Sequence, residues 1–350
     1  MTGATPITNS NAPTGSRYAR QAVLGVIGRS GQEALARSTV LVVGCGALGS
    51  TQAELMARAG IGRLILVDRD VLELHNLQRQ LLFDEKDVRE RLPKASAAAR
   101  RLKAVNSEIA IEAVVADVTA ANIEELVRAA DLVLDGTDNF ETRYLLNDTA
   151  IKTGKPWVYG GVLGTEGNVM AVRPGQGPCL RCLFSEPPDA SRLPTCETQG
   201  VLNTAVAWVA ALQVTETLKL LMGDVTAEFK LHALDIWRGS ITSVTAKRSE
   251  TCVCCGEKRF EFLNSERGSS STVLCGRNAV QVTPASKAEP DFARLRERLT
   301  PLGTVTVNGL VLEFTRGAHR MVVFPDGRVL VMGTTDTAEA RSLVAKYIGS

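Results

Sequence analysis

The chain has 350 residues, of which 45% are hydrophobic and 22% charged, a composition typical of a folded protein of about two domains. Its 40 basic and 38 acidic side chains leave a net charge of +2, which argues against a broad nucleic-acid or anionic-membrane surface. Residues 1–16 lack the apolar core of a secretory signal, and no apolar run reaches the ~18–20 residues of a membrane-spanning helix, so we expect a cytoplasmic protein.

Apolar strands alternate with amphipathic helices after a tail, residues 1–16, that we expect to be disordered. The predicted strands are residues 39–43, 64–67, 109–115 and 132–134, and the predicted helices are residues 50–59, 94–105 and 123–130. Alternation of this kind predicts an α/β fold: a Rossmann-like, doubly wound, mostly parallel sheet with helices on both faces.

Two further strands, residues 157–159 and 168–173, and a long apolar helix at 201–221 complete the first predicted domain, residues 17–266. The apolar surface of that helix suits the core or a subunit interface. Residues 267–272 are rich in Gly and Ser, which predicts a linker. Beyond it, residues 273–350 predict a small α+β domain of unknown role, with a hairpin turn at 324–327.

A glycine-rich loop lies between the first predicted strand and the next helix. Gly44, Gly46 and Gly49 form a GxGxxG motif, in which glycines permit a tight turn and the helix N-terminus offers N–H groups to phosphate. Asp68 ends the next strand, 19 residues after Gly49, where a carboxylate can accept both ribose hydroxyls. This pattern serves NAD and ATP equally, while the absence of GxxxxGK[ST] excludes a P-loop ATPase.

Polar residues beyond Asp68 favour a triphosphate over a dinucleotide. A dehydrogenase has no need of Asn76, Arg79 and Lys94 behind its ribose carboxylate, whereas three phosphates require several cationic donors. Asp138 follows another strand at the same sheet edge, where a carboxylate can hold Mg²⁺ on those phosphates. The alternative for each residue is ordinary: Arg79 and Lys94 as solvated surface charges, and Asp138 as a helix N-cap.

The cysteines are grouped rather than dispersed. Cys179 with Cys182 and Cys252 with Cys255 form two CxxC knuckles separated by 69 residues. Four thiolates fill the tetrahedral coordination of Zn²⁺ and leave no open position, which predicts a structural zinc site. A redox-active CxxC is the alternative, but we expect neither knuckle to open a helix after a strand as a thioredoxin-like site does.

Cys196 stands alone in a polar loop just before the long helix. A thiol in this position could have a lowered pKa and act as a nucleophile. The alternative, which the residues alone favour, is a half-buried small hydrophobe. The three histidines form no visible catalytic set with Ser and Asp.

These motifs together resemble the ThiF/MoeB family, bacterial E1-like adenylyltransferases that activate ubiquitin-like sulfur carriers. The resemblance covers about residues 17–262. The motifs that carry it are RYARQ, GCGALG, DRD, NLQRQ, PK and GTDN, the two CxxC knuckles and TCET. The C-terminal region is similar to the extension of the long, Bacillus-type ThiF proteins, which favours ThiS over MoaD as the carrier.

The resemblance implies adenylation of the carrier's C-terminal Gly-Gly carboxylate by ATP, with release of pyrophosphate, before sulfur transfer for thiamine thiazole biosynthesis. By family pattern, Asp68 holds the ribose, Asn76, Arg79 and Lys94 hold phosphates, and Asp138 positions Mg²⁺. The other expected nucleotide-binding residues are Gly44, Gly46, Gly49, Asp70, His75, Leu77, Gln78, Gln80 and Asn139.

The resemblance also implies a homodimer, in which Arg20 reaches the triphosphate of the other subunit, and a Cys196 that can bond covalently to the carrier's terminal glycine. No rhodanese-like domain follows the second knuckle, so we expect a separate cysteine desulfurase or rhodanese as sulfur donor. MoaD, for molybdenum cofactor biosynthesis, is the alternative carrier. An NAD(P)-dependent oxidoreductase and a non-catalytic scaffold are more distant alternatives.

Overall fold

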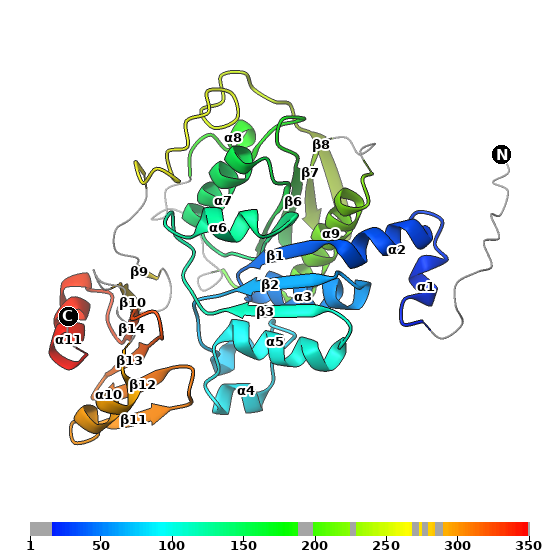
Figure 1. The fold of residues 1–350 in the computed structure, drawn as a ribbon. Helices are drawn as coiled ribbons and strands as arrows, with labels where there is room; N and C mark the ends of the chain where they lie inside the picture. The colour runs from blue at the N-terminus through cyan, green and yellow to red at the C-terminus, as the bar shows by residue number, and fades with distance from the viewer. Residues whose placement is uncertain are drawn as a thin grey trace, which may run out of the picture.

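The computed structural model describes residues 16–187, 199–224, 229–267, 273–274, 279–283 and 290–348. Most of the chain folds into a large sheet with helices on both faces, and a second, antiparallel sheet with two helices follows at the C-terminus (Figure 1). Among the described helices, none combines the length and the apolar character needed to cross a bilayer.

The large sheet has eight strands in the order β3-β2-β1-β4-β5-β6-β7-β8. From β3 to β5 all neighbours are parallel, and β6, β7 and β8 extend the sheet as an antiparallel meander, so the predicted mostly parallel α/β fold is confirmed. The strands are β1 (Thr39–Val43), β2 (Arg63–Val67), β3 (Ala110–Val114), β4 (Leu132–Asp135), β5 (Trp157–Leu163), β6 (Glu166–Val172), β7 (Lys230–Asp235) and β8 (Ser240–Thr245).

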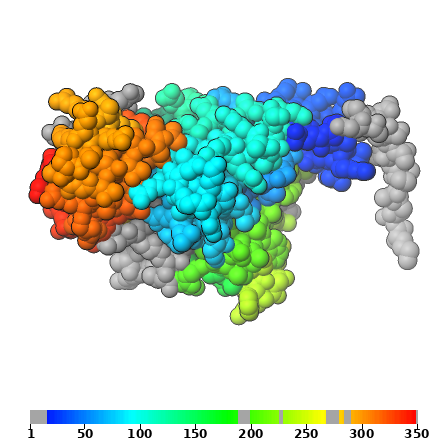
Figure 2. Space-filling view, turned by 90° about the horizontal axis from the view of Figure 1, so that it is seen from below, coloured from blue at the N-terminus to red at the C-terminus, as the bar shows by residue number. Residues whose placement is uncertain are grey.

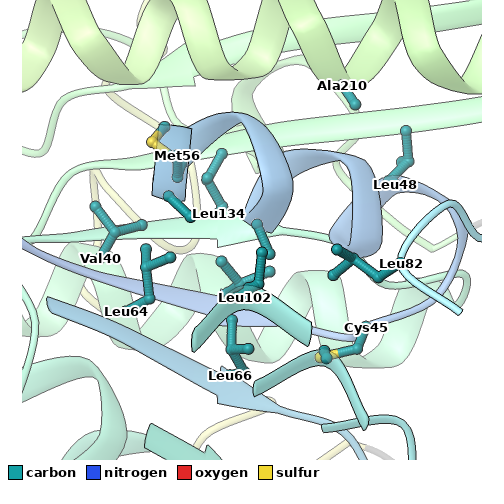
Figure 3. Packing of buried hydrophobic residues seen from close by; sticks show 14 of the residues in the cluster. Val40, Cys45, Leu48, Met56, Leu64, Leu66, Leu82, Leu102, Leu134 and Ala210 are labelled. Carbon is teal, nitrogen blue, oxygen red and sulfur yellow. The ribbon is translucent and has the colours of Figure 1, made fainter. Parts of the chain in front are cut away.

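Alternate residues of the strands face two separate cores. Val40 and Val42 pack under α2, α3, α5 and α9, whereas Leu41 and Val43 pack under α6, α7 and the cysteine knuckles. Figure 3 shows Met56 of α3 above the first of these faces. The helices are α1 (Ala19–Ala22), α2 (Gly28–Arg37), α3 (Ala47–Ala59), α4 (Glu85–Arg89), α5 (Lys94–Val105), α6 (Ile123–Arg128), α7 (Phe140–Thr153), α8 (Leu180–Leu183) and α9 (Asn203–Leu221), with a 3₁₀ turn η1 (Leu74–Asn76).

The C-terminal domain is built on a smaller sheet of order β11-β12-β13-β14-β10-β9. The predicted turn joins β13 to β14: the Gly327 N–H donates to the Phe324 carbonyl at 3.0 Å, and Gly327 has φ +83°. The elements are β9 (Val273–Leu274), β10 (Ala279–Val282), α10 (Phe292–Leu299), β11 (Thr304–Val307), β12 (Leu312–Arg316), β13 (His319–Val323), β14 (Val329–Met332) and α11 (Thr337–Tyr347).

Some boundaries differ from the predicted ones for reasons that involve glycine. Helix α3 begins at Ala47, three residues before the predicted start at Ser50, because the bare Gly49 lets the helix turn pass directly under the Gly44 carbonyl. Strand β5 continues past Tyr159, its predicted end, to Leu163. A Cβ on Gly160 would collide with Gln213 of α9, so this glycine is required by the packing of α9 on the strand and does not end it. The predicted linker falls mainly on residues 268–272, which lie outside the described part of the chain.

Candidate active site

The glycine loop after β1 lies against the loop after β4, where the strand order of the sheet reverses. Gly44 has φ +88°, and its N–H donates to the Val67 carbonyl at 2.7 Å. A Cβ on Gly136 would lie 2.5 Å from the Gly44 carbonyl oxygen, so the two loops touch through bare backbone. This contact brings the predicted residues after Gly136 to the glycine loop.

Space is left open at the N-terminus of α3. A Cβ on Gly49 would lie 1.7 Å from the Gly44 oxygen, which shows that protein packing itself requires this glycine. A Cβ on Gly46, the N-cap residue of α3, would meet its nearest neighbour, the Gly136 oxygen, at 4.0 Å. Packing does not require Gly46, so its missing side chain leaves room for a phosphate beside the helix N–H groups.

Asp68 is fixed beside this opening. Its carboxylate accepts the Cys45 N–H at 2.6 Å and the Asp70 N–H at 2.7 Å, and the residue is 8% exposed. Burial raises the pKa of the Asp68 carboxyl, and the nearby Lys94 ammonium opposes that shift. A fixed carboxylate at the end of β2 is placed as ribose recognition requires.

Lys94, the first residue of α5, forms a buried ion pair with Asp70. Its ammonium lies 3.0 Å from the Asp70 carboxylate, its N–H donates to the Asp70 carbonyl at 2.9 Å, and the residue is 2% exposed. The alternative that Lys94 is a solvated surface charge is therefore wrong. Arg79 is half-buried, and its guanidinium donates to the His75 carbonyl at 3.0 Å.

The predicted 75–80 segment forms η1 and the turn that follows it. Asn76 is buried and accepts the Glu73 N–H at 3.1 Å, while His75 is exposed and lies 3.3 Å from the Glu73 carboxylate. Leu77 packs against the core cluster that contains Cys45. Of the two remaining predicted residues in this segment, Gln80 is buried and Gln78 is exposed.

Asp138 is exposed in the loop after β4. The N-cap of α7 is Asn139, whose side-chain oxygen accepts the Thr142 N–H at 2.8 Å, so the alternative that Asp138 is the cap is wrong. Asp138 therefore sits just before a helix start, in the loop that Gly136 brings against the glycine loop. An exposed carboxylate in this position is suited to a cation.

A buried polar network behind this loop was missed by sequence reasoning. Arg143 donates through Nε to the Asp135 carboxylate at 3.1 Å and through Nη2 to the Thr137 and Gly160 carbonyls at 2.8 and 3.0 Å. The Asp135 carboxylate also accepts the Thr137 N–H at 2.9 Å. The network fixes the backbone immediately before Asp138.

Two glutamines complete the support of that loop. Gln52 of α3 and Gln213 of α9 each donate to the Asp135 carbonyl at 2.9 Å, and both are fully buried. The available signal was a glutamine within each of these two largely apolar helices, because a buried amide must find a hydrogen-bond partner.

The four knuckle cysteines converge on one point. Their sulfur atoms all lie within 4.8 Å of one another, with 3.6 Å between Cys179 and Cys252 and 3.3 Å between Cys182 and Cys255. Four thiols in this arrangement can hold a metal such as zinc, as the spacing predicted. Cys179 is the N-cap residue of the short helix α8, so the first knuckle does open a helix. Residues 173–178 separate it from the end of β6, so it does not directly follow a strand as a thioredoxin-like site does.

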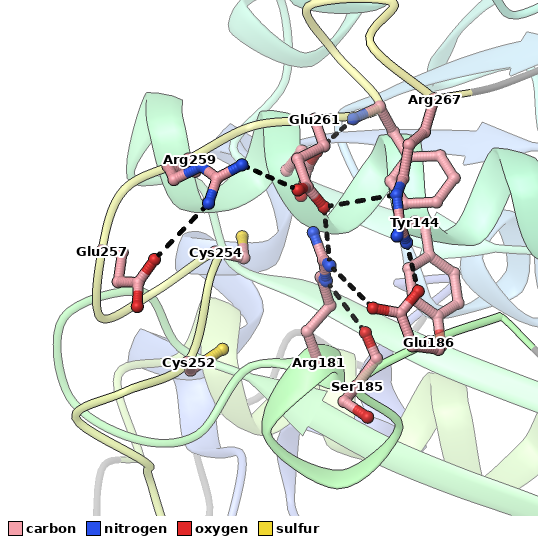
Figure 4. Close-up of polar contacts among 12 residues, drawn as sticks. Tyr144, Arg181, Ser185, Glu186, Cys252, Cys254, Glu257, Arg259, Glu261 and Arg267 are labelled. Carbon is pink, nitrogen blue, oxygen red and sulfur yellow. Dashed lines mark hydrogen bonds and ion pairs between the residues drawn. The ribbon is translucent and has the colours of Figure 1, made fainter.

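Charged side chains anchor the first knuckle (Figure 4). Arg181, between its two cysteines, donates to the Glu261 carboxylate at 2.9 Å, and its guanidinium lies over the rings of Tyr144 and Phe262. The Tyr144 hydroxyl donates to the Phe184 carbonyl at 2.8 Å. These contacts hold the knuckle against α7, the helix whose N-cap is Asn139.

One predicted residue, Arg20, is not brought to this site by its own chain. Cys196 lies outside the described residues. Arg20 is exposed on α1, which is fastened to the far end of α3, where Gln21 donates to the Ala59 carbonyl at 2.9 Å. Because α3 has 13 residues, the glycine loop lies roughly 20 Å away along the helix. Arg20 therefore cannot complete the site of its own chain.

A Rossmann-like sheet with a glycine loop that is open at Gly46, a fixed carboxylate beside it and a four-cysteine cluster is the arrangement of a nucleotide-binding α/β enzyme. The chain matches the model of the ThiF family over residues 18–254. It belongs to the ThiF family, which confirms the predicted resemblance.

Named relatives support the same assignment. A Bacillus subtilis (strain 168) protein, sulfur carrier protein ThiS adenylyltransferase, is 42% identical over 95% of this chain and 99% of its own length. A Thermus thermophilus sulfur carrier protein adenylyltransferase is 39% identical over 69% and 91%. The Sus scrofa adenylyltransferase and sulfurtransferase MOCS3 is 36% identical over 81% and 64%. The chain is an adenylyltransferase.

Solved structures share the fold. Escherichia coli MccB with ATP has a TM-score of 0.60 at 24% identity, over 70% of this chain and 75% of that one. PaaA has a TM-score of 0.54 at 22% identity, over 67% and 73%. These similarities support the fold of the large domain.

Proposed function

We propose that this chain adenylates the C-terminal Gly-Gly carboxylate of ThiS with ATP, releasing pyrophosphate, as the activation step before sulfur transfer in thiamine thiazole biosynthesis. The observation that carries the proposal is the opening at Gly46 beside the fixed Asp68 carboxylate, which suits a nucleotide with its phosphates on the N-terminus of α3. The ThiS adenylyltransferase relative, matched over almost its whole length, supports ThiS as the carrier.

Adenylation of a carboxylate does not require a strong general base. A carboxylate is already ionised at neutral pH, so the carrier's terminus can attack the α-phosphate without losing a proton. The protein's contribution is alignment and neutralisation of charge at the phosphates. In this proposal Asp68 holds the ribose, while Asn76, Arg79 and Lys94 hold phosphates on the side of η1 and α5.

Two metals belong to the proposal. Asp138 would hold Mg²⁺, which supplies positive charge to the phosphates, and its exposed carboxylate beside the glycine loop fits that role. The four knuckle thiolates would hold Zn²⁺ with no open position, so that metal would be structural. The Asn147 side chain of α7 accepts the Leu180 N–H at 2.9 Å, which ties the knuckle to the helix that follows Asp138.

The proposed active unit is a homodimer. Arg20 can serve a nucleotide only in a second copy, because α3 separates it from the site of its own chain. The segment that follows it exposes three apolar side chains, Val23, Leu24 and Val26, which supports a covered surface at this end. We propose a cysteine desulfurase or rhodanese as the sulfur donor, and a covalent bond between Cys196 and the carrier.

MoaD is the second candidate carrier. MOCS3 relatives at 36% identity over 81% of this chain favour it, and the same opening would accept the same Gly-Gly tail. The choice of carrier would then depend on surfaces outside the nucleotide site.

ATP–pyrophosphate exchange tests the proposal. With purified ThiS and MoaD offered separately, we expect label from pyrophosphate to return to ATP with ThiS and not without a carrier. Asp138→Ala should lower exchange by about 10²-fold or more, because it removes the proposed metal ligand. Glu141→Ala, an exposed carboxylate in the first turn of α7, is the matched control and should exchange normally. Exchange with MoaD alone would transfer the proposal to that carrier, and silence with both would contradict it.

A further inference from the structure

The C-terminal domain is fastened to two short segments of the large domain, residues 69–73 and 90–91, and both flank residues of the nucleotide site. We propose that this domain positions the ribose and phosphate side of the site, with Arg328 and Asn308 as positioning residues. The inference rests on the proposed function, and it assigns a role to the C-terminal domain that the sequence did not show. In Figure 2 the orange C-terminal domain lies directly against the cyan part of the large domain.

The first attachment is to Arg69, the residue between Asp68 and Asp70. Arg328 donates through Nη1 to the Arg69 carbonyl at 2.7 Å and through Nε to the Asp326 carboxylate at 2.9 Å. Its side chain is 3% exposed, and its guanidinium lies 3.7 Å from the centre of the Phe324 ring. A planar group held by a ring and a carboxylate has little freedom, so it fixes the carbonyl that it binds.

The Arg69 side chain is also connected to the C-terminal domain, through Asp117. It donates to Asp117 at 3.0 Å, and Gln281 of β10 donates to the other oxygen of that carboxylate at 2.6 Å. Four residues further on, Arg320 of β13 lies 2.7 Å from Glu73, the N-cap residue of η1. Main chain and side chains between Asp68 and η1 are thus tied to the C-terminal sheet.

The second attachment is to the residues before Lys94. Asn308 donates to the carbonyls of Glu90 and Arg91 at 3.0 and 2.8 Å, and Glu313 pairs with the Arg91 guanidinium. Arg91 has φ +52°, a left-handed conformation that disfavours a side chain and persists where surrounding contacts hold it. These contacts come from the C-terminal domain.

The two attached segments pair with each other. Leu72 donates to the Leu92 carbonyl at 3.1 Å, Lys94 donates to the Asp70 carbonyl at 2.9 Å, and Val71 forms an antiparallel bridge with Pro93. Asp70 and Lys94, the buried ion pair beside the ribose carboxylate, therefore lie at the end of one small ladder. A shift of the ladder would move both charges together.

Apolar and polar contacts both attach the ladder to the C-terminal domain. Val71 of the ladder is buried in one hydrophobic cluster with Val322 and Phe324. A cavity of about 540 Å³ lies beside the ladder and is lined mainly by the large domain, with Arg320 as its lining residue from the C-terminal domain. The C-terminal domain therefore holds the ladder by apolar packing as well as by the ion pairs and hydrogen bonds.

Asn308→Ala in the full chain tests the inference, with Arg328→Lys as a conservative second variant. We expect the dissociation constant of ATP, measured by calorimetry without carrier, to rise about tenfold. The KM for the carrier should stay unchanged. Arg298→Gln is the matched control, because Arg298 donates to the Tyr347 and Ile348 carbonyls at 2.8 and 2.7 Å within the C-terminal domain.

The possible outcomes separate the inference from the proposed function. A wild-type chain that binds no ATP would overturn the proposed function and the inference with it. Wild-type binding with an unchanged constant in Asn308→Ala would overturn the positioning role alone. The positioning role would also be overturned if Arg298→Gln weakened ATP binding as much as Asn308→Ala does. The same holds if Asn308→Ala lost carrier affinity together with ATP affinity, because both results would show a general structural role. Arg328→Lys should bind ATP more weakly than wild type, and equal binding would count against Arg328.

Discussion

Asp68 carries a carboxyl that its surroundings make hard to ionise. Burial raises its pKa above the ordinary value of 3.8; the Lys94 ammonium opposes the shift, and the Asp70 charge adds to it. The folded chain therefore keeps this proton to a higher pH than the unfolded chain does. The contribution of Asp68 to the free energy of unfolding falls as pH rises from 3.8 through the raised pKa.

Ligand binding should show the opposite dependence on pH. Ribose hydroxyls donate to the ionised carboxylate, so we expect adenosine affinity to fall as pH falls through the raised pKa of Asp68. In Lys94→Met the opposing positive charge is lost, and the acid limb of the affinity profile should move to higher pH. Adenosine has no phosphates, so a lost phosphate contact cannot imitate that shift. Calorimetric titrations from neutral pH into the acid range would measure it.

Lys103→Met is the control, because Lys103 is an exposed lysine of the same helix, α5. Its profile should coincide with that of the wild type. An acid limb that stays in place in Lys94→Met would mean that another group controls adenosine binding.

At the scale of elements, the glycines where the β1–α3 connection meets the loop after β4 serve different purposes. Gly44 adopts a left-handed conformation, and Gly49 and Gly136 allow backbone to approach the Gly44 carbonyl. Gly46 has neither constraint, since its φ is −74° and a Cβ there would meet its nearest neighbour, the Gly136 oxygen, at 4.0 Å. Packing therefore requires Gly44, Gly49 and Gly136, and Gly46 is the glycine that we propose for phosphate binding.

Alanine at two of these positions should separate folding from binding. Gly46→Ala should unfold within about 0.5 kcal/mol of wild type but lose ATP affinity, because its methyl group occupies the phosphate space. Gly49→Ala should lose about 1–3 kcal/mol of unfolding free energy or more, because its methyl group meets the Gly44 oxygen. Urea denaturation and ATP titration measure the two effects. Wild-type affinity in Gly46→Ala would place the phosphates elsewhere.

Elements with a strong local pattern were predictable from the sequence. Residues 39–43 form β1 with the predicted bounds, because a β-branched run ends in a glycine, and residues 94–105 form α5, because an Ala-rich run follows a proline. The cysteine spacing likewise predicted the four-thiol cluster, which the structure forms. The strand and the helix are each written within a few neighbouring residues, and the cluster is written as two short CxxC motifs.

Contacts between distant residues leave no such pattern. Arg143 and Asp135 lie eight residues apart, but their network is closed by Gln52 and Gln213 from two other helices. Arg328 binds the carbonyl of Arg69, 259 residues away, and a main-chain acceptor has no side-chain signature. The sequence therefore predicts which residues carry charge at the site, but not what holds them in position.

At the scale of the whole molecule, the two ends of α3 have different neighbours. Its N-terminus borders the proposed nucleotide site, and its C-terminus borders α1, which carries Arg20. Figure 2 shows the blue N-terminal helices and the orange C-terminal domain on opposite sides of the molecule. A site that uses Arg20 must therefore combine the two ends from different subunits.

Mixing two inactive variants tests that geometry. Arg20→Ala and Asp138→Ala should each lose exchange activity as homodimers, whereas a heterodimer would combine both lesions in one site and leave the other intact. Random mixing should recover about a quarter of wild-type exchange, because half the dimers are mixed and each has one good site of two. Arg29→Ala, an exposed arginine of α2, is the control and should stay active alone. No recovery after confirmed subunit exchange would contradict a role for Arg20 across the interface.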